Sequence, residues 1–196
     1  MIFKRHTIIG LIVITALVWL VGCSTQPPVP VTQYYHLPKA ISDKKARPKL
    51  YDAIVVRRPI ANGIYNERAI LFAQSAKPLE LSRHHYHYWS QAPIYLVQDY
   101  LLEFLRQTGV AGQVKTHGRA DVTLTITIKR FERLLSSKGD QVLIELEIVS
   151  ESKKGSIIKV YHQTAPASGS GVYAAVQAFG LTMRKIALQL LDDLSS

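Results

Sequence analysis

Three histidines within four residues, His84, His85 and His87, are the side chains of this chain best suited to binding a metal ion. In an extended strand, His85 and His87 would share one face, where two imidazoles could ligate the same ion. The sequence offers no third ligand at a suitable spacing. A polar, aromatic-rich strand face explains the same residues, so we expect neither a metal nor another cofactor here.

Sequence motifs for catalysis are missing: there is no G-x-S-x-G, no H-E-x-x-H and no P-loop. Residues 169–174 match the dinucleotide pattern G-x-G-x-x-A, but no strand follows that could present an acid to a ribose. Arg57 and Arg58, next to Pro59, could bind phosphate, although we favour a solvent-exposed charge pair at a strand end. We therefore predict that the protein is not an enzyme and has no catalytic residues.

The only cysteine, Cys23, follows two basic residues, Lys4 and Arg5, and a mainly apolar run of 14 residues over 8–21. These features are typical of a secretory signal peptide. The stretch that begins at Leu20 reads Leu-Val-Gly-Cys and resembles the lipobox of bacterial lipoproteins, whose cysteine is acylated and becomes the mature N-terminus. The alternative is a transmembrane anchor, but the run is shorter than the roughly 20 residues that cross a bilayer.

Lipidation at Cys23 would determine where the protein resides, because two or more acyl chains hold a protein stably on a membrane that it does not cross. Ser24 follows the cysteine, and in enteric-type lipoproteins a residue other than aspartate there favours the outer membrane, at its periplasmic face. Eight residues of polyproline II span only about 25 Å. We expect a signal peptide over 1–22, the lipidated cysteine and a Pro-rich tether over 23–31, and one domain over 32–196.

The net charge of the whole chain is +10 and includes Lys4 and Arg5, so the chain without its signal peptide carries +8. A basic exported domain favours acidic partners, either anionic lipid headgroups or an acidic protein face. Nucleic acid is not expected, because no basic stripe is interleaved with aromatic residues. Residues 39–49 are also rich in lysine and arginine; they could adhere to headgroups, but a solvated loop is the interpretation we favour.

Hydrophobic periodicity predicts two amphipathic helices and several strands. One helix lies between an N-cap at Ser90 and a terminating Gly109, and the other covers 172–194. Alternating or β-branched runs predict strands at 34–38, 53–57, 67–74, 79–89, 122–128, 142–148 and 157–163. The predicted fold class is α+β: an antiparallel β-sheet with two long α-helices packed on one face.

Short motifs also occur in a distinctive order along nearly all of the chain after Cys23. They are Tyr34-Tyr35, Leu37-Pro38, Val55-Val56-Arg57-Arg58-Pro59, Arg68-Ala69-Ile70, Trp89, Pro93, Thr108-Gly109, Arg119-Ala120-Asp121 and Phe131-Glu132. In this order and spacing they resemble the ABC-type transport auxiliary lipoprotein family, whose best-known branch is PqiC.

The resemblance implies an accessory lipoprotein of an MCE-type lipid-transport system, in which a periplasmic MCE protein carries or channels lipids between membranes. Such a lipoprotein would be the outer-membrane docking end and would contribute to envelope integrity without catalysis. A homo-oligomeric ring would meet a tubular partner most simply. The alternatives are an assembly or chaperone lipoprotein for an outer-membrane barrel protein, and a lipoprotein enzyme, which would need convergent titratable residues in a pocket.

Overall fold

The longest strand, β7 (Val122–Leu135), is the centre of the sheet in this computed structural model, which describes residues 29–42, 48–61 and 63–195. Its first half alternates as predicted: Leu124 and Ile126 are fully buried, whereas Thr123 and Thr125 are half-buried. A β-bulge between Ile128 and Arg130 then shifts the register by one residue. Because a bulge reverses which residues face the core, Phe131 points inward after it and is buried.

The two edges of β7 pair with different sets of strands. On one edge β7 pairs antiparallel with β8 (Gln141–Ser152), which pairs antiparallel with β9 (Gly155–Pro166). On the other edge three short strands pair parallel to β7, one after another: β2 (Tyr51–Val56), β3 (Ile60–Ala61) and β4 (Ala69–Gln74). A 3-10 turn, η2 (Gly63–Asn66), lies between β3 and β4.

Three further strands extend the sheet from the short strands. The hairpin partner of β4 is β5 (Lys77–Trp89), and β1 (Gln33–Tyr35) pairs parallel with the end of β5. At the other end of the strand order, β6 (Ala111–Lys115) pairs parallel with β2. The α+β class is confirmed, but the sheet is mixed rather than antiparallel throughout, since β1, β2, β3, β4 and β6 all make parallel pairs.

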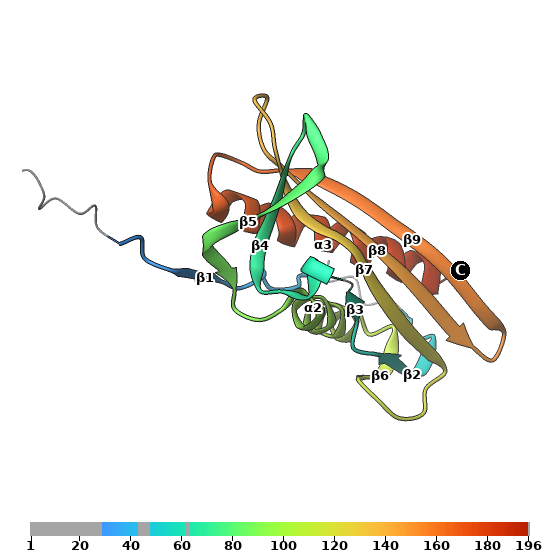
Figure 1. Cartoon of the computed structure of the whole chain (residues 1–196). Coiled ribbons are helices and arrows are strands. Elements are labelled where there is room, and N and C mark those ends of the chain that lie inside the picture. Colours follow the sequence, from blue (N-terminus) through green and yellow to red (C-terminus); the bar gives the residue numbers. More distant parts are fainter. Residues whose placement is uncertain (1–28, 43–47, 62, 196) are drawn as a thin grey trace, which may run out of the picture. The chain divides into compact units, whose positions relative to one another are not determined.

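Both helices, α2 (Pro93–Thr108) and α3 (Val172–Leu194), lie behind the same face of the sheet (Figure 1). α3 packs on β8 and β9, whereas α2 packs on β2 and β6. Between helices and sheet, the ring of Phe179 stacks on Phe131 at 4.6 Å and meets Trp89 edge-on at 5.0 Å. No helix among the described residues is both long and apolar enough to span a membrane.

Several residues of the sequence motifs stand at junctions between elements. Gly109 ends α2 in the left-handed conformation, with φ of 70°, which glycine adopts without strain. The carboxylate of Asp121, just before β7, accepts the N–H groups of Asp52 (2.7 Å) and Ala53 (3.1 Å), and these bonds lower the pKa of Asp121. At the start of α2 the prediction was wrong: the N-cap position is Ala92, without a side-chain cap, and not Ser90.

Candidate functional site

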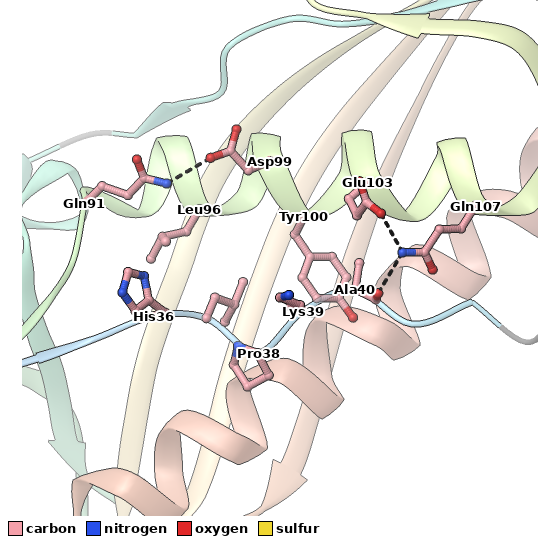
Figure 2. A pocket seen from close by; sticks show the side chains of 11 residues that line it. His36, Pro38, Lys39, Ala40, Gln91, Leu96, Asp99, Tyr100, Glu103 and Gln107 are labelled. Atoms are coloured by element: carbon pink, nitrogen blue, oxygen red, sulfur yellow. Dashed lines mark hydrogen bonds between the residues drawn. The ribbon is translucent and has the colours of Figure 1, made fainter.

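An extended segment, residues 36–42, crosses the outer side of both helices, and we call it the strap (Figure 2). Gln107 of α2 fixes it at one end: its Nε2 donates to the carbonyl oxygen of Ala40 (3.0 Å) and its Oε1 accepts the N–H of Ser42 (3.0 Å). On the α3 side, Arg184 Nε donates to the carbonyl oxygen of Ile41 (3.2 Å). The strap thus joins two helices that have few contacts with each other.

Pro38 of the strap lies directly on α3 at Gly180. A Cβ added to Gly180 would stand 2.7 Å from both Cβ and Cγ of Pro38, closer than side chains pack. The hydroxyl of Tyr100 in α2 donates to the carbonyl oxygen of Gly180 at 3.4 Å, and burial raises the pKa of Tyr100 to about 12. A glycine in mid-helix costs about 1 kcal/mol relative to alanine, and here the strap explains its presence.

Between the strap and α2 the surface is hollowed into an open pocket of about 490 Å³. Its polar wall comes from α2 and from Gln91 just before it: Gln91 Nε2 donates to Asp99 (2.9 Å) and Gln107 Nε2 donates to Glu103 (2.7 Å). The opposite wall is the strap, with His36 and Pro38 (Figure 2). Both carboxylates therefore accept a hydrogen bond from a glutamine side chain at the polar wall.

We predict that Gly180→Ala loosens the strap while α3 stays intact. Overpacking typically lowers folding stability by 1–3 kcal/mol, and the better helix propensity of alanine offsets about 1 kcal/mol of this loss. We therefore expect a net loss of folding stability of up to about 2 kcal/mol. Hydrogen exchange should rise at residues 36–42 but not within α3.

The matched variant is Gly180→Ala with Pro38→Gly, which removes all three atoms closest to the new methyl group. Its strap should exchange no faster than that of Pro38→Gly alone. Faster exchange throughout α3 in the single variant would contradict this role of Gly180.

The histidine cluster lies on a large β-bulge of β5. In the pairing with β4, Ala69 faces Tyr88 and Leu71 faces Arg83, so four residues of β5 stand opposite one residue of β4. The bulge breaks the alternation that would have placed His85 and His87 on one face. Instead the rings of His84 and His87 lie edge to face at 5.7 Å. Among the described residues, no three His, Cys, Asp or Glu side chains lie close enough to hold a metal ion.

The environments of His84 and His87 are those of structural residues. The Nδ1 of His87 shares a hydrogen bond of 2.9 Å with the hydroxyl of Tyr35 in β1. His84 packs on Phe72 at 4.6 Å, and its Nε2 is buried without a hydrogen-bond partner. Burial, followed by the positive charge of Arg133, lowers the pKa of His84 to about 4, so the ring is neutral at physiological pH. A neutral ring fits this packed position.

A second open pocket, of about 570 Å³, lies beside this bulge. Its walls come from the segment after η2 and from β5, and they carry Arg68, Arg83, His85 and Tyr88 with a single acid, Glu67. Arg83 pairs with Glu67 at 2.6 Å. Sequence reasoning singled out His85 and named Arg68 only within a family motif; the hairpin of β4 and β5 brings Arg68 and Arg83 together.

Arg57, Arg58 and residues 169–171, also considered from the sequence, line neither pocket. Cys23 is outside the described residues. The guanidinium of Arg58 lies over the ring of Tyr95 in α2, 5.1 Å from its centroid, and Arg57 is exposed beside it at the end of β2. Residues 169–171 form the turn into α3, where Gly169 and Gly171 have positive φ values.

Comparisons with known proteins decide the family. A sequence model of the family described as "ABC-type transport auxiliary lipoprotein component" matches residues 35–190. This chain belongs to that family. A comparison with functionally curated proteins finds no significant match.

Two crystal structures have the fold of this family member. The protein XCC0632 from Xanthomonas campestris, described as DUF330, matches with a TM-score of 0.71 and 20% identity over 81% of this chain and 92% of its own. An uncharacterized protein matches with a TM-score of 0.70 and 14% identity over 84% of this chain and 99% of its own. As a member of the auxiliary lipoprotein family, the chain is an accessory component of an ABC-type transport system in the cell envelope.

Proposed function

We propose that this protein is the outer-membrane docking lipoprotein of an MCE-type intermembrane lipid-transport system and has no catalytic role. Acylation at Cys23 would hold it at the periplasmic face of the outer membrane, and the domain would bind the periplasmic MCE protein. The family membership supports the transport role.

The observation that carries the docking role is the free edge of β9. This strand has 12 residues and, among the described strands, pairs only with β8. Its first half exposes three large apolar side chains: Ile157 (62% exposed), Ile158 (66%) and Val160 (57%). Long apolar edge strands template pairing with another chain, and proteins usually cover or charge them. An edge of this kind suits docking by strand addition, in which backbone hydrogen bonds supply affinity.

Charge around this edge favours an acidic partner. Lys153 and Lys154 form the turn between β8 and β9 and are exposed. Lys159 is held at 2.6 Å by Asp193 of α3, which keeps the middle of the edge close to neutral. A partner strand with apolar residues and flanking acids would complement both features. Opposite charge would also speed the encounter of the two proteins at low salt.

The direct test is affinity capture of the full-length lipoprotein from solubilised envelopes. We expect an MCE-type protein and its membrane transporter components to be recovered. Ile158→Glu should lower their recovery at least ten-fold, because a charge on the edge opposes strand pairing. Leu181→Glu is the matched control, since it places the same charge at a similarly exposed apolar position (53%) on α3 and should change little.

The alternative is an assembly or chaperone lipoprotein for an outer-membrane barrel protein. It predicts that the captured proteins are barrel precursors or the assembly machinery, with no MCE protein among them. That result would contradict the proposed function. A homo-oligomeric ring is compatible with either outcome, because a partner bound to the β9 edge leaves the other surfaces of the domain available for self-assembly.

A further inference from the structure

The chain enters the domain at β1, which is an edge strand of the sheet beside the end of β5. In the proposed anchored state, ten residue steps lead from Cys23 to Gln33, the first residue of β1. Even a fully extended chain spans only about 33–36 Å over these steps. The β1–β5 edge is therefore held close to the membrane, whatever the orientation of the remaining domain.

The surface at this edge combines aromatic and cationic side chains. The guanidinium of Arg68 lies over the ring of Tyr34, 5.3 Å from its centroid, and the rings of Tyr34 and Tyr88 are 6.0 Å apart. Tyr34 is 60% exposed, although it is part of a β-strand. A hydrogen bond of 3.2 Å from Nε of Arg68 to the carbonyl oxygen of Trp89 orients the guanidinium.

This group of Tyr34, Tyr88 and Arg68 borders the pocket beside the β5 bulge, because Arg68 and Tyr88 also line that pocket. The pocket adds Arg83, whose side chain is 52% exposed, and Leu81 at its wall. Guanidinium groups bind phosphate oxygens with two parallel hydrogen bonds. Tyrosine prefers the boundary between lipid and water, where its ring is apolar and its hydroxyl is wet. The pocket therefore presents the chemistry of a headgroup site at the end of the domain that the tether holds near the bilayer.

We infer that the β1–β5 edge is a membrane-contact surface on which Arg68 and Arg83 bind the phosphate of anionic lipid headgroups, while Tyr34 and Tyr88 lie at the bilayer interface. The inference rests on the proposed lipid anchor at Cys23. It gives the domain a fixed orientation on the membrane rather than a freely swinging one. The tether brings the surface to the bilayer, and the headgroup contacts hold it there.

The test uses the mature chain from Ser24, without acyl groups, and measures its binding to vesicles by flotation. Residues 32–196 form one compact unit that holds the described core, so this chain retains both the surface and the fold. We expect binding to phosphatidylcholine vesicles that contain phosphatidylglycerol, and little binding to phosphatidylcholine alone. Arg68→Gln and Arg83→Gln should each weaken binding about five-fold, which corresponds to the ~1 kcal/mol that a basic side chain contributes at an anionic membrane.

Two further variants make the result specific to this surface. Arg119→Gln removes the same charge from the exposed loop between β6 and β7, at the other end of the strand order, and should leave binding nearly unchanged. Glu67→Gln removes the acid beside Arg83 and should strengthen binding. Melting temperatures identify any variant that fails to fold. If Arg68→Gln fails to fold, Arg83→Gln still tests the inference, because the Arg83 side chain is exposed.

Three results would overturn the inference: no binding to anionic vesicles, an equal loss in Arg119→Gln and Arg83→Gln, or the same or weaker binding in Glu67→Gln. Equal losses would mean that overall charge alone attracts the domain. Because the assay contains neither an acyl chain nor a transport partner, a negative result would overturn the membrane-contact surface and leave the docking function standing. Conversely, failure to capture an MCE protein would not affect the vesicle result.

Discussion

Ile126→Asp should unfold the domain or cost about 4 kcal/mol of stability or more. Ile126 is fully buried at the middle of β7, directly opposite Ile148 of β8, and belongs to the core between sheet and helices. A carboxylate placed there either stays neutral or remains charged and unpaired, and both states are costly. Small domains are stable by only 5–15 kcal/mol, so thermal or urea unfolding should show a large shift.

The matched control is Thr125→Asp, one residue away in the same strand. Thr125 points to the other face of the sheet and is half-buried, so the new carboxylate can reach water and should cost below about 1 kcal/mol. If Ile126→Asp does not fold, Ile126→Ala should cost about 2–5 kcal/mol, and Thr125→Ala far less. Equal shifts for the two positions would contradict the register of β7.

Cys23→Ala should abolish lipid labelling and remove the protein from the outer-membrane fraction. Each buried acyl CH₂ contributes about 0.8 kcal/mol, so loss of the chains removes far more binding energy than any single surface contact supplies. The measurement is palmitate incorporation followed by membrane fractionation. Ser24→Asp is the matched control: it should label like the unmodified protein but move to the inner-membrane fraction. A Cys23→Ala variant that still labels and still fractionates with the outer membrane would contradict the anchor.

Local periodicity predicted the elements that bury one regular face. α3 begins at Val172 and ends at Leu194, as its spacing of apolar residues indicates. β7 and β8 were recognised from their alternation, although both extend beyond the predicted segments. β6 was missed because Ala111–Lys115 has no apolar alternation. The parallel pairs of β2, β3 and β4 with β7 join distant segments, so no local pattern indicates their direction.

The functional surfaces were less predictable than the fold, because each depends on contacts between distant segments. The strap was predicted partly as the end of a strand over 34–38 and partly as a solvated basic loop from residue 39, but β1 ends at Tyr35. Its partner Gly180 gave no sign of a role until Pro38 was placed on it. The spacing of His85 and His87 suggested one shared face, but the bulge in β5 places His84 beside His87 instead. Arg68 and Arg83 are fifteen residues apart, and only the hairpin joins them in one pocket.

The most direct test of the docking role is site-specific photo-crosslinking in living cells from position 158 of β9. The side chain of Ile158 is 66% exposed on the free edge, so a photoreactive residue there can reach a partner without disturbing the core. We predict a covalent adduct with a periplasmic MCE-type protein, and no such adduct from position 181 on α3. An adduct with barrel-assembly proteins, or equal yields from both positions, would contradict docking through this edge.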